Sequence, residues 1–207
     1  VSHMGFITLG IFAGTPDATT GAVLQMINHG IVSGALFMCV GVLYERLHTR
    51  NLGQYGGVVT PMPYFAVVFV ILMLASVALP GTNGFIGEFM ILAGSFSVTQ
   101  WGTVLAVTGV VLGATYMLKL TRGLLYGEIT NPQIEKMLDL SKREKMMFWP
   151  LIALVFFIGL LPQYTLNYIQ PWAENLHKVY APKDLKILSA RDIDLSLTKE
   201  HTPYAGH

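Results

Sequence analysis

The sequence predicts an all-α, polytopic membrane protein with about five transmembrane helices. Hydrophobic residues make up 53% of the 207 residues, whereas charged residues make up only 12%. A chain of this composition is too apolar for an ordinary soluble domain. Its apolar residues also fall into long runs separated by short polar segments, a pattern typical of helices that cross a bilayer.

Composition also excludes several kinds of function. The formal net charge is +1 and the basic residues form no patch, so we expect no nucleic-acid partner. Cys39 is the single cysteine and lies in an apolar run, which excludes a disulfide framework and a thiolate metal site. We expect neither a metal ligand nor a catalytic residue in this chain.

The first two helices are expected at residues 1–14 and 21–44, with a loop at 14–20. The first run would span about 20 Å, which is shorter than a bilayer core requires. We therefore expect a truncated helix, and with it a chain that is the C-terminal portion of a longer protein. The loop contains Gly14, Pro16 and small polar residues.

Polar side chains of the second helix recur at spacings of three and four: Gln25, Asn28, His29 and Ser33. They share one face, which must look into protein or water because unpaired amides facing lipid are costly. His29 is a candidate proton carrier, since imidazole titrates near neutral pH. The alternative is a neutral histidine hydrogen-bonded across a helix contact. His3, in the first helix, is a second candidate.

The third helix, residues 63–96, is expected to be broken. Residues 63–79 carry no charge, and Pro80, Gly81 and Gly84 lie in the segment 80–84 that follows. Proline removes a helical donor and glycine relaxes the backbone, so two half-helices are predicted. Irregular backbone at membrane depth is tolerated only where it is buried in protein or lines a wet cavity.

Glu88 is the one carboxylate of the second half-helix. It is expected about one turn from the helix start, where the positive end of the dipole favours a negative charge. An ionisable group at this depth is a functional candidate. The alternative is a protonated or water-capped structural glutamate in a kinked helix.

The fourth helix is expected at residues 102–126. Lys119 and Arg122 lie near its far end and are interpreted as snorkelling or interfacial residues. If Lys119 lay deeper, it would become a partner for Glu88.

The last part of the membrane domain, which as a whole covers residues 1–169, contains a surface helix and a final span. Residues 129–146 carry basic residues with a helical rhythm and predict a helix on the membrane surface. The span is expected at residues 147–169, with aromatic residues at both edges. Residues 170–207 are expected to form a polar C-terminal tail.

Lysine and arginine counts predict the orientation. Residues 45–62 and 119–146 hold eight of the thirteen, whereas residues 14–20 and 97–100 hold none. The loops after the second and fourth helices are therefore placed in the cytoplasm or its matrix or stromal equivalent.

Several motifs connect the chain to a known family. They are VSHMG at 1–5, GAVLQMINHG at 21–30, LYER at 43–46 with HTR at 48–50, and LPGT at 79–82 followed by FIGEF at 85–89. In these motifs the sequence resembles the C-terminal half of subunit M, or chain 4, of proton-pumping NADH:quinone oxidoreductase (respiratory complex I), of the antiporter-like superfamily. The likeness covers about residues 1–165.

The resemblance implies the last five helices of a fourteen-helix antiporter-like fold. It implies a line of protonatable groups, His3, His29 and Glu88, supported by Gln25, Asn28 and Ser33 and bridged by water. The rest of the family's proton path lies on helices that this sequence does not contain.

The implied function is that of a non-redox translocase subunit, driven by electron transfer to quinone elsewhere in the complex. The chain itself would bind no cofactor; FMN, iron–sulfur clusters and quinone are expected in other subunits. Its partners would be other membrane subunits of complex I, the lipid bilayer and protons. The expected location is an energy-transducing membrane, the bacterial inner (plasma) membrane.

Two alternatives stay open from the sequence. The same fold serves in subunits of multi-subunit sodium/proton antiporters and of membrane-bound hydrogenases. From another class, the chain could be a structural membrane anchor whose buried polar groups only hold helices together.

Overall fold

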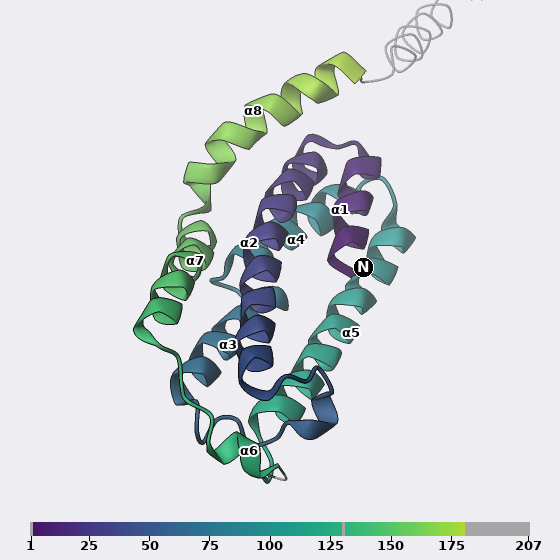
Figure 1. Cartoon of the computed structure of the whole chain (residues 1–207). Helices are drawn as coiled ribbons and strands as arrows, with labels where there is room; N and C mark the ends of the chain where they lie inside the picture. The colour runs from purple at the N-terminus through teal and green to yellow at the C-terminus, as the bar shows by residue number, and fades with distance from the viewer. Residues whose placement is uncertain (1, 130, 181–207) are drawn as a thin grey trace, which may run out of the picture.

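The structure, a computed structural model, describes residues 2–129 and 131–180, and helices dominate this part of the chain (Figure 1). The helices in chain order are α1 (Ser2–Ala13), α2 (Pro16–Leu47), the short 3-10 helix η1 (Leu52–Gln54), α3 (Pro63–Ser76), α4 (Asn83–Phe96), α5 (Gln100–Leu125), α6 (Pro132–Glu135), α7 (Lys142–Leu160) and α8 (Pro162–Tyr180).

Helix α2 is the centre of the arrangement, because α1, α3, α4, α7 and α8 all contact it (Figure 1). Its closest neighbour is α4, and glycines make the approach possible. A Cβ atom at Gly21 would lie 2.8 Å from the backbone nitrogen of Ile91, and one at Gly94 would lie 2.5 Å from that of Ala18. Only residues without a side chain allow two helices to approach this closely.

Helix α2 is longer than predicted at both ends. The expected loop at 14–20 is wrong beyond its first two residues, because Thr15 and Pro16 form a helix start. The Thr15 hydroxyl accepts a hydrogen bond from the Ala18 backbone nitrogen, and proline stands at the first helical position. At its other end α2 continues to Leu47, where His48 adopts the left-handed conformation with φ of 52°.

The third helix is broken, as predicted, but over residues 77–82. Pro80 and Gly81 lie in this break, whereas Gly84 belongs to the first turn of α4. Gly81 has a φ of +93°, a conformation that favours glycine. Helix α7 supports the break from outside, because a Cβ atom at Gly159 would lie 2.5 Å from the carbonyl oxygen of Gly81.

The predicted surface helix at residues 129–146 is wrong. The structure has the four-residue helix α6, a non-helical segment at 137–141, and then the start of α7 at Lys142. Ser141 and Glu144 form a capping box, in which each side chain accepts a hydrogen bond from the other residue's backbone nitrogen. This cap starts helix α7 inside the segment that was predicted to form one continuous surface helix.

The predicted last span at residues 147–169 is also divided. Helix α7 ends at Leu160 and α8 begins at Pro162, with an angle of 70° between them. Leu161, between the two, has φ of −124° and ψ of 53°. Proline cannot donate to the preceding turn and disfavours the helical conformation of the residue before it, which accounts for the bend at this position.

The polar tail begins later than residue 170, because α8 runs to Tyr180. Leu166, Ile169 and Ala173 form its buried face, and α8 packs on α2. His177 Nδ1 lies 2.8 Å from the carbonyl oxygen of Gly14, at the loop between α1 and α2. The rest of the predicted tail, residues 181–207, lies outside the described residues.

By length and hydropathy, α2 and α5 are each able to cross a membrane. The bent pair of α7 and α8 passes the same test as a third span, and α1 and α3 are shorter apolar helices. The count of about five spans therefore requires α1 and the broken pair of α3 and α4 to be included.

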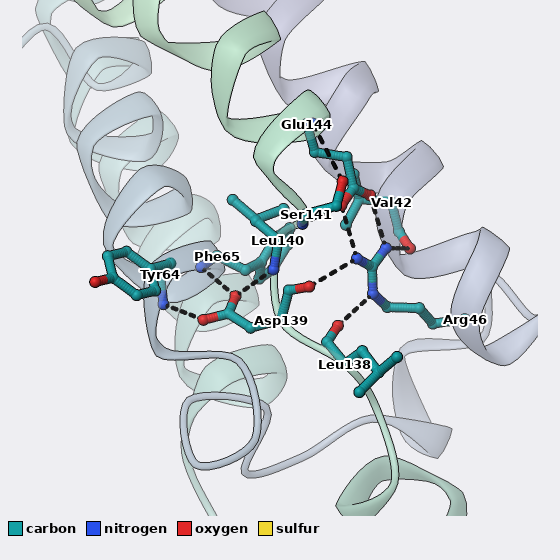
Figure 2. Close-up of polar contacts among 9 residues, drawn as sticks. All are labelled: Val42, Arg46, Tyr64, Phe65, Leu138, Asp139, Leu140, Ser141 and Glu144. Atoms are coloured by element: carbon teal, nitrogen blue, oxygen red, sulfur yellow. Dashed lines mark hydrogen bonds and ion pairs between the residues drawn. The ribbon is translucent and has the colours of Figure 1, made fainter.

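A polar network joins three helix ends near the C-terminus of α2 (Figure 2). Both terminal nitrogens of Arg46 donate to the Glu144 carboxylate, at 3.0 Å each. The guanidinium also donates to the carbonyl oxygens of Val42, Leu138 and Asp139. All five N–H groups of Arg46 are therefore used, and the fork geometry fixes α7 to α2.

Asp139 extends the network to α3 (Figure 2). Its carboxylate accepts hydrogen bonds from the backbone nitrogens of Tyr64 and Phe65, at 2.8 and 3.1 Å. These are first-turn donors of α3, which has no side-chain cap from its own N-cap residue, Met62. A residue 74 positions away from Phe65 thus caps the helix that leads into the break.

Glu144 lies before the apolar part of α7, and its pKa is lowered to about 2. Burial opposes its ionisation, but hydrogen bonds from Arg46 and Ser141 and the charge of Arg46 outweigh this effect. The ion pair therefore stabilises the fold above about pH 4.5, the ordinary value, and is lost as the pH falls towards about 2.

We expect Glu144→Gln in the full-length protein to lower the free energy of unfolding by about 2 kcal/mol at pH 7, because Arg46 loses a charged, bidentate partner. Thermal unfolding in detergent measures the change. The difference from wild type should shrink as the pH falls below about 4.5. Glu128→Gln, which removes an exposed carboxylate, is the control. A pH-independent difference, or equal effects of both variants, would contradict the role of the ion pair.

Candidate functional site

Glu88 lies in the second turn of α4 and is 6% exposed. Its Oε1 atom accepts a hydrogen bond from Gln25 Nε2 at 3.1 Å and lies 3.1 Å from His3 Nδ1. Both contacts end on the same oxygen. Within the described structure, Oε2 is left to hold a proton or to bind water.

Three helices bring these groups together: α1 supplies His3, α2 supplies Gln25 and α4 supplies Glu88. Gly87 sets the separation of α2 and α4 at this point. A Cβ atom at Gly87 would lie 3.1 Å from Gln25 Cβ and 3.2 Å from Gln25 Cα, and it would collide with Gln25 Oε1. The glycine therefore allows the amide of Gln25 to reach the neighbouring carboxylate.

His3 connects Glu88 to a second histidine. The ring centroids of His3 and His29 lie 5.6 Å apart, and the structure records no direct hydrogen bond between them. The other ring nitrogen of His3, Nε2, lies 3.5 Å from the Ser76 hydroxyl at the end of α3. Proton exchange between the two rings requires a small movement or one bridging water.

A pair of asparagines anchors the start of α4 on α2. Asn28 Nδ2 donates to the backbone oxygen of Asn83 at 2.7 Å, and Asn83 Nδ2 donates to Asn28 Oδ1 at 3.1 Å. Both side chains are buried. Asn83 Oδ1 has no hydrogen-bond partner in the described structure, and buried water is the usual partner of such an atom.

A cavity of about 270 Å³ adjoins these groups. It follows α2 from Gln25 to Val40, about 22 Å at 1.5 Å per residue. At roughly 30 Å³ per molecule, it has space for about nine waters. Its polar lining comprises His3, Gln25, Asn28, His29, Ser33 and Ser76, with Tyr116 from α5.

The structure thus brings the predicted site residues together. Gln25 and Asn28 are buried and reach α4, whereas His29 and Ser33 are half-buried and line the cavity. Lys119 is exposed on α5 and forms no ion pair with Glu88 in the described structure.

Four contributors were missed from sequence: Ser76, Asn83, Gly87 and Tyr116. Asn83 carried a signal, because an amide beside a helix break at membrane depth requires a partner. The other three depend on contacts between helices and gave no local signal.

Comparison with known proteins identifies the family. The family described as "NADH:quinone oxidoreductase/Mrp antiporter, TM" matches residues 1–113. The chain belongs to this family. Its membership and its apolar helices identify a multi-pass membrane protein, and the resemblance seen in the motifs is confirmed.

Relatives include the NADH-quinone oxidoreductase subunit M of Rhodobacter capsulatus, 43% identical over 87% of this chain and 35% of the relative. The subunit M of Rickettsia felis is 48% identical over 85% of this chain and 36% of the relative. The chain therefore spans about a third of the length of these curated relatives.

A solved structure of respiratory complex I from Thermus thermophilus with bound NADH contains a similar chain. The TM-score is 0.79 at 34% identity, over 85% of this chain and 37% of that chain. The arrangement of helices around Glu88 therefore belongs to an antiporter-like fold.

We expect Gly87→Ala in the full-length protein to cost about 1 to 3 kcal/mol of stability, because the added methyl group presses on Gln25. Thermal unfolding in detergent measures the loss. The matched control is Gly34→Ala, where a Cβ atom meets nothing within 4 Å. The control should be neutral or slightly stabilising, since alanine favours helix more than glycine does. Equal unfolding temperatures for the two variants would exclude this close contact.

Proposed function

We propose that the chain forms part of a proton-translocating membrane subunit of NADH:quinone oxidoreductase, in which Glu88, His3 and His29 carry protons. The observation that supports this most directly is the environment of Glu88. A buried carboxyl group beside a helix break receives two contacts on one oxygen and leaves the other oxygen for a proton. Family membership supports the same assignment.

The carboxyl group of Glu88 is buried and has polar partners from two other helices, His3 of α1 and Gln25 of α2. A carboxyl group that binds and releases protons at membrane depth needs such partners, because lipid supplies none.

The path we propose runs from Glu88 to His3, through a bridging water to His29, and into the cavity along α2. Each ring presents two nitrogens, so a histidine can accept a proton on one side and donate from the other. Gln25 and Asn28 hold the polar face of α2 against α4, and Ser33 lies one turn beyond His29 on the cavity wall.

The driving force is proposed to come from electron transfer to quinone in other subunits, where FMN and iron–sulfur clusters are also expected. The chain would then act as a non-redox part of the oxidoreductase, in contact with other membrane subunits. Its relatives from Rhodobacter and Rickettsia support a bacterial inner membrane as its location.

A second candidate is a subunit of a sodium/proton antiporter, because the family description names the Mrp antiporter as well. Identities of 43% and 48% to subunit M favour the oxidoreductase. A transport assay in vesicles distinguishes the two functions. NADH oxidation drives proton transport by the oxidoreductase, whereas a sodium gradient drives proton transport by the antiporter.

We expect Glu88→Gln in the full-length subunit to leave the complex assembled and to slow proton transfer through this subunit by about a hundredfold, because the amide cannot take up a proton. Proton pumping coupled to NADH oxidation in reconstituted vesicles measures the effect. Glu128→Gln is the control, since its carboxylate is exposed outside the site. Normal pumping by an assembled Glu88→Gln complex would support the structural-anchor alternative.

For His29→Ala we expect a milder loss, of less than about tenfold, because the cavity already has space for water in place of the ring. The same vesicle assay measures it. A loss as large as that of Glu88→Gln would mean that water does not substitute for this ring.

A further inference from the structure

A second hollow lies at the C-terminal end of α2, and Arg46, Ser141 and Glu144 of the network in Figure 2 form part of its lining. It is a cleft of about 1100 Å³ between the last turns of α2, the helix α6 and the start of α7. The Lys and Arg counts predict that this end faces the cytoplasm or its matrix or stromal equivalent. Nothing in the proposed proton path uses this cleft.

The charged lining of the cleft has a cationic excess. It contains Arg46, Lys136 and Arg143 as cations, with Glu45 and Glu144 as carboxylates, a net charge of +1. Arg46 and Glu144 pair with each other and use all the guanidinium donors. Lys136 and Arg143 are exposed and form no ion pair in the described part of the chain. Their charges are therefore available to an anion.

The inner part of the cleft is apolar and open. Met38, Gly41 and Met147 line it one or two turns deeper than the basic residues of the rim. A Cβ atom at Gly41 would meet nothing within 4 Å, so α2 leaves a groove there. Tyr44 of α2 and Trp149 of α7 are exposed on the two helices that border the cleft, and aromatic residues of this kind mark the level of the lipid headgroups.

We propose that this cleft binds an anionic phospholipid such as phosphatidylglycerol. The phosphate would lie between Lys136 and Arg143, and the upper part of an acyl chain would lie over Gly41. Glu45 supplies an acceptor for a headgroup hydroxyl. Basic clefts between helices on the cytoplasmic side are suited to anionic headgroups. A free phosphate would leave most of the 1100 Å³ unfilled and the apolar wall uncovered.

The test uses the full-length subunit in its assembled complex, purified in detergent and stripped of lipid. Phosphatidylglycerol, phosphatidylcholine and inorganic phosphate are added separately, and native mass spectrometry counts the bound molecules. We expect the double variant Lys136→Gln, Arg143→Gln to bind phosphatidylglycerol about thirtyfold more weakly at this site, since two headgroup contacts are lost.

The control double variant, Arg122→Gln with Lys142→Gln, removes the same charge from exposed positions outside the cleft and should bind as wild type does. A second variant, Gly41→Phe, keeps every charge and fills the groove. It should also lose phosphatidylglycerol, because the acyl chain has no space.

The outcomes separate the sources of the anion. Loss of phosphatidylglycerol in both cleft variants, with the control unchanged, supports the proposal. Equal retention by wild type and the charge variant overturns it, as does equal binding of phosphatidylcholine. Displacement of the lipid by millimolar inorganic phosphate would show an anion site without lipid recognition. A polypeptide segment filling the cleft in a structure of the complex would also overturn the proposal.

Discussion

A carboxyl group at membrane depth requires polar partners from the protein, because lipid supplies none. The surroundings of Glu88 meet this requirement from three helices at once. Gln25 reaches it only because α2 and α4 approach closely, and the approach depends on Gly21, Gly87 and Gly94. The glycine contacts that hold α2 against α4 therefore also give Glu88 its hydrogen-bond partner.

The break between α3 and α4 also needs partners from the rest of the protein. Breaking the helix exposes backbone groups and brings the positive end of α4 near Glu88. The asparagine pair Asn28 and Asn83 fixes this end to α2, and Gly159 lets α7 close against the break. At the far end of α3, Asp139 caps the first turn. The two half-helices are thus anchored separately, although the chain between them is irregular.

The C-terminal end of α2 has its own polar network, separate from the groups around Glu88. Arg46 joins α2 to α7 and to the segment after α6, and it does so with every donor that it has. The cleft beside it keeps Lys136 and Arg143 exposed. Arg46 is therefore structural, whereas Lys136 and Arg143 keep their charges exposed.

By itself, the sequence determined the class of fold, the polar face of α2, the broken helix and the position of Glu88 just after the break. These features follow from composition, spacing and local backbone chemistry, which act over a few residues. The end of α7 before Pro162 and the capping box of Ser141 and Glu144 also have local causes, although the helix bounds predicted there were wrong. The sequence did not determine the roles of Asn83, Gly87 and Asp139. Those were decided by the tertiary structure, because a cap or a close contact depends on partners brought from 50 or more positions away.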